Sequence, residues 1–187
     1  DLQKLMAGTG KVEAYYFSVS PALFGDLAER LQHWGMADAD SRIVVEKPFG
    51  RDLESARALN ATLARYFSED QIYRIDHYLG KDTVQNILAF RFSNSFLEPT
   101  WHNKGIEDIT IRLWEKGGIG NRGLFYDGVG ALRDVGQNHL LQLLALFAME
   151  KPKIFEAEYI RSQRAAILKS LKILSREQIK NQTIRGQ

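Results

Sequence analysis

The stretch RIVVEKPFG, residues 42–50, predicts the fold of the first part of the chain. Its β-branched run, residues 43–45, indicates a short buried strand, and Pro48 ends that strand because proline has no backbone N–H to give to a sheet. Asp52 then precedes an amphipathic run that predicts a capped helix over 53–67. The stretch therefore predicts a buried strand followed at once by a helix.

The same order of elements occurs immediately before this stretch. Residues 12–20, VEAYYFSVS, are rich in aromatic and β-branched side chains and predict a strand, and residues 21–34 carry apolar side chains at helical spacing behind Pro21. Strand, helix, strand and helix with short connections indicate a parallel sheet with crossover helices. Two such units are too few for a complete nucleotide-binding fold. We expect residues 1–76 to be the C-terminal part of a Rossmann-like coenzyme-binding domain.

The apolar pattern changes after residue 76. It predicts a helix over about 82–91, a strand over 106–116, a long helix over 129–149 and a basic helix over 158–172. Residues 77–187 therefore indicate part of an α+β domain, and the predicted fold class is α/β followed by α+β.

Composition excludes several classes of protein. The chain has 187 residues, 44% of them hydrophobic and 26% charged, and a net charge of only +2, which favours a globular protein without a nucleic-acid or membrane-binding surface. It has no cysteine, so disulfides and thiolate metal sites are excluded, and no metal site is predicted. Residues 1–11 lack the apolar run of a signal peptide, and no membrane-spanning stretch occurs. We expect a soluble, cytoplasmic protein.

The stretch YRIDHYLGK, residues 73–81, concentrates charge around a glycine. If a helix starts near Asp76, His77 and Lys81 share one of its faces, and if it starts after Gly80, both lie at or before its first turn. Either way two potential cations lie where the helix dipole disfavours positive charge, which makes sense if a phosphate binds to the helix start. The alternative is a solvated lysine beside a surface histidine.

A second group of polar residues lies in GALRDVGQNHLLQLLALF, residues 130–147. His139 falls on an apolar stripe with other side chains at helical spacing: Leu132, Val135, Leu143 and Leu146. A buried neutral histidine can act as a general base if a carboxylate orients it, and Asp76 is one candidate partner. Asp134 is rotated away from His139 on an α-helix but could bind a polyhydroxylated substrate. The alternative is a core histidine satisfied by an ordinary hydrogen bond.

Lys47 follows directly after the buried strand of residues 42–46. The carboxyl edge of a parallel sheet is where open α/β folds bind ligands, so Lys47 is a candidate binding residue. The alternative is a solvated strand end. A cis peptide bond before Pro48 is plausible at such a turn.

These motifs resemble one family, glucose-6-phosphate dehydrogenase. Its substrate signature R-I-D-H-Y-L-G-K is unbroken at residues 74–81, EKPFG occurs at 46–50, and residues 130–152 are similar to a further block of the family. IRGQ at 184–187 resembles another block. The resemblance runs over nearly the whole chain and is clearest from residue 42 to residue 152.

The resemblance implies a role for each candidate residue. It implies that His139 is the catalytic base and that Asp76 is its carboxylate partner. The sugar phosphate is then bound by His77 and Lys81 with help from Tyr78. The remaining roles concern the coenzyme side and the sugar hydroxyls: Lys47 lies between substrate and coenzyme, and Glu115 and Asp134 bind hydroxyl groups. The implied reaction is oxidation of glucose 6-phosphate to 6-phosphogluconolactone with hydride transfer to NADP, the first oxidative step of the pentose phosphate pathway.

The resemblance also implies what the chain lacks. Family members are more than twice as long, with a glycine-rich coenzyme turn upstream and most of a large, mostly antiparallel sheet downstream. We therefore expect an internal piece of a family chain, inactive alone, whose full-length protein is a homo-oligomer, either a dimer or a tetramer. Two alternatives remain open: a non-catalytic module that binds sugar phosphate or supports assembly, and a sugar dehydrogenase of the glucose–fructose oxidoreductase type, which shares the E-K-P strand end but has no counterpart to RIDHYLGK.

Overall fold

The computed structural model describes residues 11–184. Residues 1–10, which carry most of the argument against a signal peptide, and residues 185–187, which carry most of the IRGQ block, lie outside the described part. The described chain divides into two compact units. The first consists of residues up to 78 together with 124–130, and the second of residues 79–123 together with 131 onwards. The predicted domain boundary after residue 76 stays a prediction.

A three-stranded parallel sheet forms the centre of the first unit. The strands are β1 (Ala14–Phe17), β2 (Arg42–Glu46) and β3 (Ile72–Ile75), in the spatial order β1-β2-β3. This confirms the parallel sheet that the sequence predicts. Because strand order follows chain order, β3 is an edge strand within the described residues.

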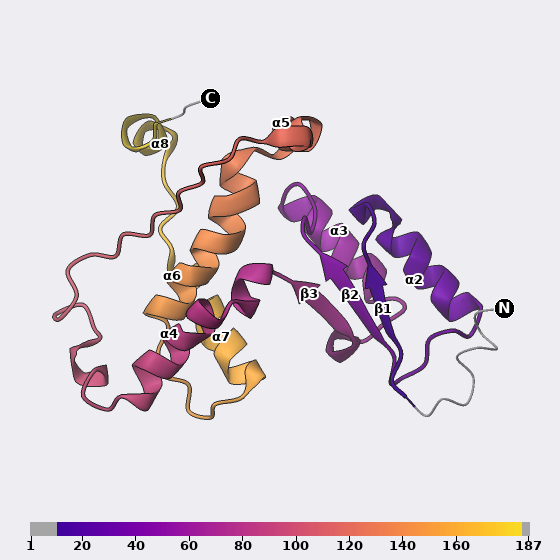
Figure 1. Ribbon diagram of the computed structural model, residues 1–187, viewed down its shortest axis with the longest axis horizontal. Coiled ribbons are helices and arrows are strands. Elements are labelled where there is room, and N and C mark those ends of the chain that lie inside the picture. Colours follow the sequence, from indigo (N-terminus) through magenta and orange to yellow (C-terminus); the bar gives the residue numbers. More distant parts are fainter. Residues whose placement is uncertain (1–10, 185–187) are drawn as a thin grey trace. The chain divides into compact units, whose positions relative to one another are not determined.

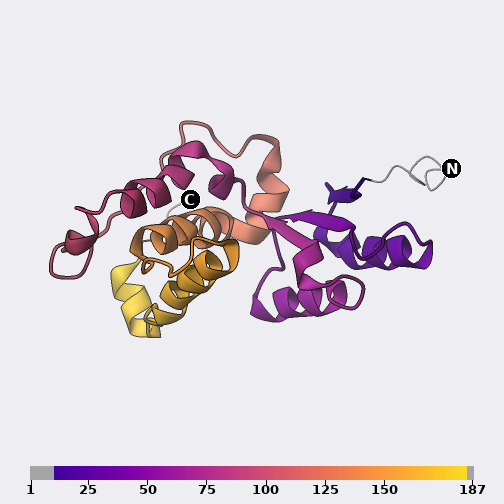
Figure 2. The same ribbon diagram turned by 90° about the horizontal axis from the view of Figure 1, so that it is seen from below.

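Two helices connect these strands, and both lie on the same face of the sheet (Figures 1 and 2). A 3₁₀ turn, η1 (Pro21–Leu23), leads into α2 (Phe24–His33), and α3 (Leu53–Leu63) and a second 3₁₀ turn, η2 (Glu69–Gln71), connect β2 to β3. Helix α3 begins with a capping box, since the Asp52 carboxylate accepts a hydrogen bond of 2.8 Å from the Ser55 backbone N–H. The predicted cap at Asp52 is confirmed.

The core of the first unit lies between the sheet and these helices. Side chains alternate along the strands, so Ile43 and Val45 of β2 are fully buried while Tyr16 and Tyr73 on the opposite face are exposed. The buried residues of this core are Phe17, Phe24, Ala28, Ile43, Val45, Leu63, Phe67 and Ile72. Parallel strands with one helix-covered face place their carboxyl ends at one edge, which positions Lys47 and Asp76.

The regular secondary structure described in the second unit is entirely helical, and residues 101–119 are a non-helical stretch. After the 3₁₀ turn η3 (His77–Gly80), the elements are α4 (Asp82–Ser93), η4 (Glu98–Thr100), η5 (Gly120–Arg122), the π-helix η6 (Leu132–Leu140), α6 (Leu141–Ala148), α7 (Ala157–Ser170) and α8 (Arg176–Gln182). Helix α5 (Gly123–Ala131) precedes η6 and falls mostly in the first unit. The predicted helices over 82–91 and 158–172 are confirmed by α4 and α7.

Helices α4, α6 and α7 surround the core of the second unit. Val84 of α4 packs with Leu146 of α6 and with Met149, and Ile160 and Ile167 of α7 lie against this cluster. None of the helices between residues 11 and 184 has the length and apolar character that would let it cross a membrane.

One predicted element is wrong. Residues 106–115 are extended but belong to no sheet (Figure 1), so the antiparallel sheet expected from the resemblance does not appear among residues 11–184. The apolar pattern of residues 106–116 indicates which side chains favour burial. A strand, however, also needs a neighbouring strand to pair with its backbone N–H and C=O groups. The three described strands all lie in the first unit, where β2 pairs with both β1 and β3.

Candidate functional site

Lys47 and Asp76 lie at the same edge of the parallel sheet. Glu46 of β2 pairs in register with Ile75 of β3, and each is the last residue of its strand. Lys47 and Asp76 therefore leave adjacent strands at the same level, at the carboxyl edge where open α/β sheets bind ligands. The structure brings these two predicted residues together within the first unit.

The turn after Lys47 has a specific backbone. The Lys47–Pro48 peptide bond is cis, as the sequence allows. Gly50 has φ +91°, and a Cβ there would lie 2.5 Å from the Ala56 backbone nitrogen, so a side chain at this position is excluded twice over. The Tyr16 hydroxyl donates a hydrogen bond to the Glu46 carboxylate, which raises the pKa of Tyr16. Contacts on both sides thus determine the place of Lys47 at the sheet edge.

The segment that follows β3 turns sharply. Asp76 is partly buried, and its Oδ1 accepts a hydrogen bond of 3.0 Å from the Tyr78 backbone N–H. The rings of His77 and Tyr78 meet edge to face with centroids 5.0 Å apart. His77 is exposed, whereas Tyr78 is partly buried. Asp76 therefore orders the turn that presents the His77 and Tyr78 side chains.

Lys81 occupies the N-cap position of α4, with an extended backbone and no side-chain capping bond. Because α4 begins at Asp82, the second of the two predicted helix starts is correct, and His77 and Lys81 do not share a face of one α-helix. Lys81 is exposed at a helix start whose backbone N–H groups attract anions. His77 belongs to the first unit and Lys81 to the second.

Asp134 and His139 both lie on the π-helix η6 and are both buried, with exposed fractions of 4% and 3%. The prediction that Asp134 is rotated away from His139 assumes an α-helix, in which residues five apart lie on different faces. A π-helix bonds residue i to residue i+5, so residues five apart are about one turn apart and face a similar direction. The prediction is wrong for this reason, and the two polar side chains share one side of the helix.

The apolar stripe around His139 is only partly as predicted. Leu146 is buried and Val135 and Leu143 are partly buried, but Leu132 is 78% exposed. The predicted single helix over 129–149 is also interrupted, since Gly130 has φ 72° and ψ 165°, outside helical values. His139 is thus a buried histidine on a distorted helix, as a base shielded from solvent requires.

Glu115 ends the extended segment of residues 106–115 and is exposed. Asp134 has a partner that the sequence does not indicate, since Arg122 Nη1 donates to its Oδ2 at 3.4 Å. Arg122 lies twelve residues earlier in a glycine-rich turn, so no helical or strand spacing connects the two. Asp76 and His139 belong to different units, so their pairing stays a prediction.

Two family models together match nearly the whole chain. The model described as glucose-6-phosphate dehydrogenase, NAD binding domain, matches residues 1–86, and that described as glucose-6-phosphate dehydrogenase, C-terminal domain, matches residues 88–187. The chain belongs to the glucose-6-phosphate dehydrogenase family. The resemblance seen in RIDHYLGK and the neighbouring motifs is confirmed, and residues 1–86 match the part of the family that is described as its NAD binding domain.

Individual relatives agree with this assignment. A glucose-6-phosphate 1-dehydrogenase of Rhizobium meliloti (strain 1021) is 46% identical over 100% of this chain and 38% of its own length. The protein of the same name from Borreliella burgdorferi is 49% identical over 92% of this chain and 37% of its own length. The chain therefore spans well under half the length of these curated relatives.

Solved structures of the family are also similar. The crystal structure of a glucose-6-phosphate 1-dehydrogenase from Mycobacterium avium superposes with a TM-score of 0.85 at 43% identity, covering 94% of this chain and 39% of that one. A glucose-6-phosphate dehydrogenase in complex with its substrate glucose-6-phosphate gives a TM-score of 0.79 at 42% identity, covering 84% of this chain and 33% of that one.

Proposed function

We propose that this chain, within a polypeptide of its relatives' length, oxidises glucose 6-phosphate to 6-phosphogluconolactone and passes the hydride to NADP. The observation that carries the proposal is the unbroken motif of residues 74–81 in a chain of this family, together with a similar structure described as a complex with glucose-6-phosphate. On this proposal the isolated 187-residue chain is inactive, because it spans only 38% of such a relative.

Proton transfer is assigned to His139. Its burial favours the neutral imidazole, which can accept the proton of the anomeric hydroxyl group as the hydride departs. Asp76 is assigned to orient the imidazole and to stabilise the imidazolium that forms. The turn that Asp76 makes with Tyr78 supports this role, since it restricts the carboxylate before substrate arrives.

Phosphate binding is assigned to His77, Tyr78 and Lys81. A dianionic phosphate at the start of α4 would accept hydrogen bonds from backbone N–H groups of its first turn and from the Lys81 ammonium. Anchoring the phosphate, remote from the reacting carbon, provides binding energy that aligns the anomeric carbon with the base.

The sugar hydroxyl groups are assigned to Asp134 and Glu115. The assignment is better supported for Asp134 than for Glu115, because Asp134 is buried and already accepts a hydrogen bond from Arg122, which restricts its carboxylate. A restricted acceptor can distinguish hydroxyl positions, since a misplaced hydroxyl leaves a buried carboxylate less well satisfied.

Lys47 is assigned to the boundary between substrate and coenzyme. Its position fits a nicotinamide cofactor, because the carboxyl edge of a parallel sheet is the usual binding edge of such domains. The nicotinamide, when bound, accepts the hydride. Lys47 would then orient the substrate against that ring.

Assembly and location follow from the same assignment. We propose that the full-length protein is a homo-oligomer, a dimer or a tetramer, as the resemblance to the family implies. The absence of cysteine from this sequence supports a reducing compartment, the cytoplasm.

The decisive experiment measures NADPH formation by the chain extended to its relatives' length. Glucose 6-phosphate with NADP should give turnover, unphosphorylated glucose should give far less, and NAD should be the weaker acceptor. Lys81→Ala should raise KM for glucose 6-phosphate with a smaller effect on kcat. An extended protein that ignores glucose 6-phosphate under these conditions contradicts the proposal. Equal rates with NAD and NADP contradict the coenzyme assignment alone.

A further inference from the structure

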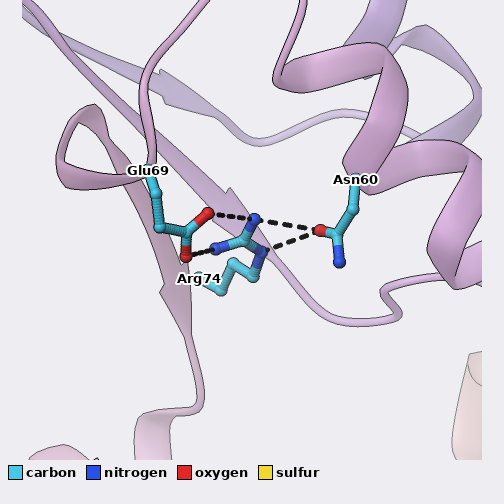
Figure 3. Close-up of polar contacts among 3 residues, drawn as sticks. All are labelled: Asn60, Glu69 and Arg74. Atoms are coloured by element: carbon cyan, nitrogen blue, oxygen red, sulfur yellow. Dashed lines mark hydrogen bonds and ion pairs between the residues drawn. The ribbon is translucent and has the colours of Figure 1, made fainter.

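Arg74 ties three elements of the first unit together through one side chain. Its guanidinium forms a two-point ion pair with Glu69, with Nη1–Oε1 at 2.7 Å and Nη2–Oε2 at 3.1 Å. Its Nε and Nη2 also donate to Asn60 Oδ1 at 3.1 and 2.9 Å. Figure 3 shows the guanidinium between the two partners, with Asn60 on α3, Glu69 at the start of η2 and Arg74 on β3. We call Arg74, Glu69 and Asn60 the Arg74 network.

Both partners of Arg74 lie on well-anchored elements. Helix α3 buries Leu63 in the core of the unit. Turn η2 is held by the buried Gln71, whose Nε2 donates to the backbone oxygens of Asp38 and Ser41 at 2.8 and 2.9 Å. The Arg74 network therefore connects β3 to two elements that the rest of the unit already fixes.

The strand that Arg74 fixes is short and lies at the edge of the sheet. β3 has four residues and pairs only with β2 among the described strands. Arg74 is the third of these residues, and Asp76 follows two positions later. Because a short edge strand has few backbone hydrogen bonds, the contacts of Arg74 near its end add to those that fix where the chain leaves the sheet, although the Glu69 side chain is 80% exposed.

The contacts argue against a direct role of Arg74 in binding phosphate. All three guanidinium nitrogens already donate to protein oxygens, and the paired Glu69 carboxylate offsets the positive charge. Lysine cannot reproduce this planar fork, because its ammonium is a single donor centre. These contacts fit a residue that holds its neighbours in place better than one that binds phosphate.

We propose that Arg74 is a positioning residue, whose bonds to Glu69 and Asn60 fix the end of β3 and thereby the Asp76 carboxylate and the His77–Tyr78 turn. The kinetic test of this inference rests on the proposed function, because it measures turnover of glucose 6-phosphate. A misplacement of about 1 Å can lower the rate about 100-fold even when the changed residue touches no substrate.

The kinetic test uses the chain extended to its relatives' length with Arg74→Lys, Glu69→Gln and the double variant. Each single variant should lower kcat about 10- to 100-fold, and the double variant should be no worse than the more damaged single variant. Loss of the oriented Asp76 carboxylate also destabilises the imidazolium, so the acidic limb of the kcat/KM pH profile should move to lower pH. Asp26→Asn, which breaks the exposed Arg30–Asp26 pair of 3.0 Å, is the matched control and should leave kcat and the pH profile unchanged.

A structural measurement separates this inference from the proposed function. The Tyr78 amide, which donates to Asp76 Oδ1, should exchange its hydrogen severalfold faster in Glu69→Gln and Arg74→Lys. The Arg42 amide, which donates to the Glu13 backbone oxygen at 2.8 Å on the side of β2 away from β3, should be unaffected. An extended protein without activity, combined with faster Tyr78 exchange in the variants, contradicts the proposed function but supports the positioning role.

Three results would overturn the positioning role. The first is Tyr78 exchange unaffected by either substitution. The second is a lower melting temperature in the variants with the kcat and pH profile of the unaltered enzyme. The third is a raised KM for Arg74→Lys with no effect of Glu69→Gln, which would make Arg74 a direct phosphate ligand.

Discussion

The two units bury different kinds of polar side chain. In the first unit the buried polar side chains of the described residues are neutral, Ser41 and Gln71, and both serve a turn between elements. In the second unit they are Arg91, Asp134 and His139, which are charged or can become charged. Burying charge is costly unless it is paired or stacked, so the second unit depends on specific polar contacts while the first depends mainly on apolar packing.

Arg91 shows how the second unit satisfies a buried charge. Its Nη1 donates to the Leu146 backbone oxygen at 3.1 Å, and its guanidinium carbon lies 4.6 Å and 4.9 Å from the ring centroids of Phe92 and Trp101. Burial lowers the pKa of Arg91, and the nearby carboxylates of Glu98 and Glu150 partly oppose that shift. The side chain therefore joins α4 to α6 and to Trp101, the residue after η4, through contacts that a simple hydrophobic residue cannot make.

The largest effect on stability is expected in the apolar core of the first unit. Phe24→Ala should lower the free energy of unfolding of that unit by about 3 to 5 kcal/mol, because Phe24 is fully buried against the sheet and leaves a cavity. Denaturant titration of the 187-residue chain measures the change. Phe96→Ala is the control, since that ring is 71% exposed, and it should cost no more than about 0.5 kcal/mol. Equal losses of stability in the two variants would contradict the view that the first unit depends mainly on apolar packing.

The next effect tests whether the second unit depends on the contacts of a buried charged side chain. Arg91→Met should destabilise the second unit by about 2 kcal/mol, since it leaves the Leu146 carbonyl group without this donor and the Glu98 carboxylate without a nearby cation. The matched control is Arg30→Met on α2, whose exposed pair with Asp26 should contribute about 0.5 kcal/mol or less. A stable Arg91→Met protein would show that the second unit does not need its buried charge.

A smaller effect is expected at the start of α3. Asp52→Ala should cost about 1 kcal/mol, because the Asp52 carboxylate accepts the Ser55 N–H at the first turn of α3. Asp52→Asn retains an acceptor oxygen and should retain most of the stability. The comparison of the two variants by thermal unfolding isolates the cap, and an alanine variant as stable as the asparagine variant would contradict it.

The smallest effect concerns pH. Hydrogen bonds from Ser41 and from the backbone N–H of Asp40 lower the pKa of Asp38 below its ordinary 3.8. A carboxyl group with a lowered pKa in the folded state adds stability above pH 3.8, and this stability is lost as the pH falls through the lower folded value. The melting temperature of the unaltered chain should therefore exceed that of Asp38→Asn at neutral pH and converge with it in acid. A constant difference down to pH 2 would contradict this.

The first unit was largely predictable from its sequence. Local rules apply there: the buried strand ends at Pro48, Asp52 begins a helix, and two strands with crossover helices imply a parallel sheet. The third strand, β3, which aligns Lys47 with Asp76, was not predicted. What the sequence did not indicate was the Arg74 network, because Arg74 and Asn60 lie fourteen residues apart on different elements. Folding brings such residues together without leaving a periodic signal.

The second unit was less predictable for a physical reason. The apolar spacing of residues 130–147 fits an α-helix, but hydrogen bonding to the fifth residue changes which side chains share a face, so Asp134 joins His139 while Leu132 is exposed. The pattern of residues 106–116 correctly indicates an extended chain, but not whether another strand pairs with it. Nothing in the sequence pattern distinguishes a buried charged residue such as Arg91 from an exposed one.

We assign to His139 the role of base in a glucose 6-phosphate oxidation. The test is the steady-state turnover of the chain extended to its relatives' length, with and without His139→Asn. We expect kcat to fall about 10²- to 10⁴-fold while KM for glucose 6-phosphate changes little, because the substitution removes proton transfer but not the phosphate site. A folded His139→Asn enzyme with undiminished kcat would show that His139 is not the base.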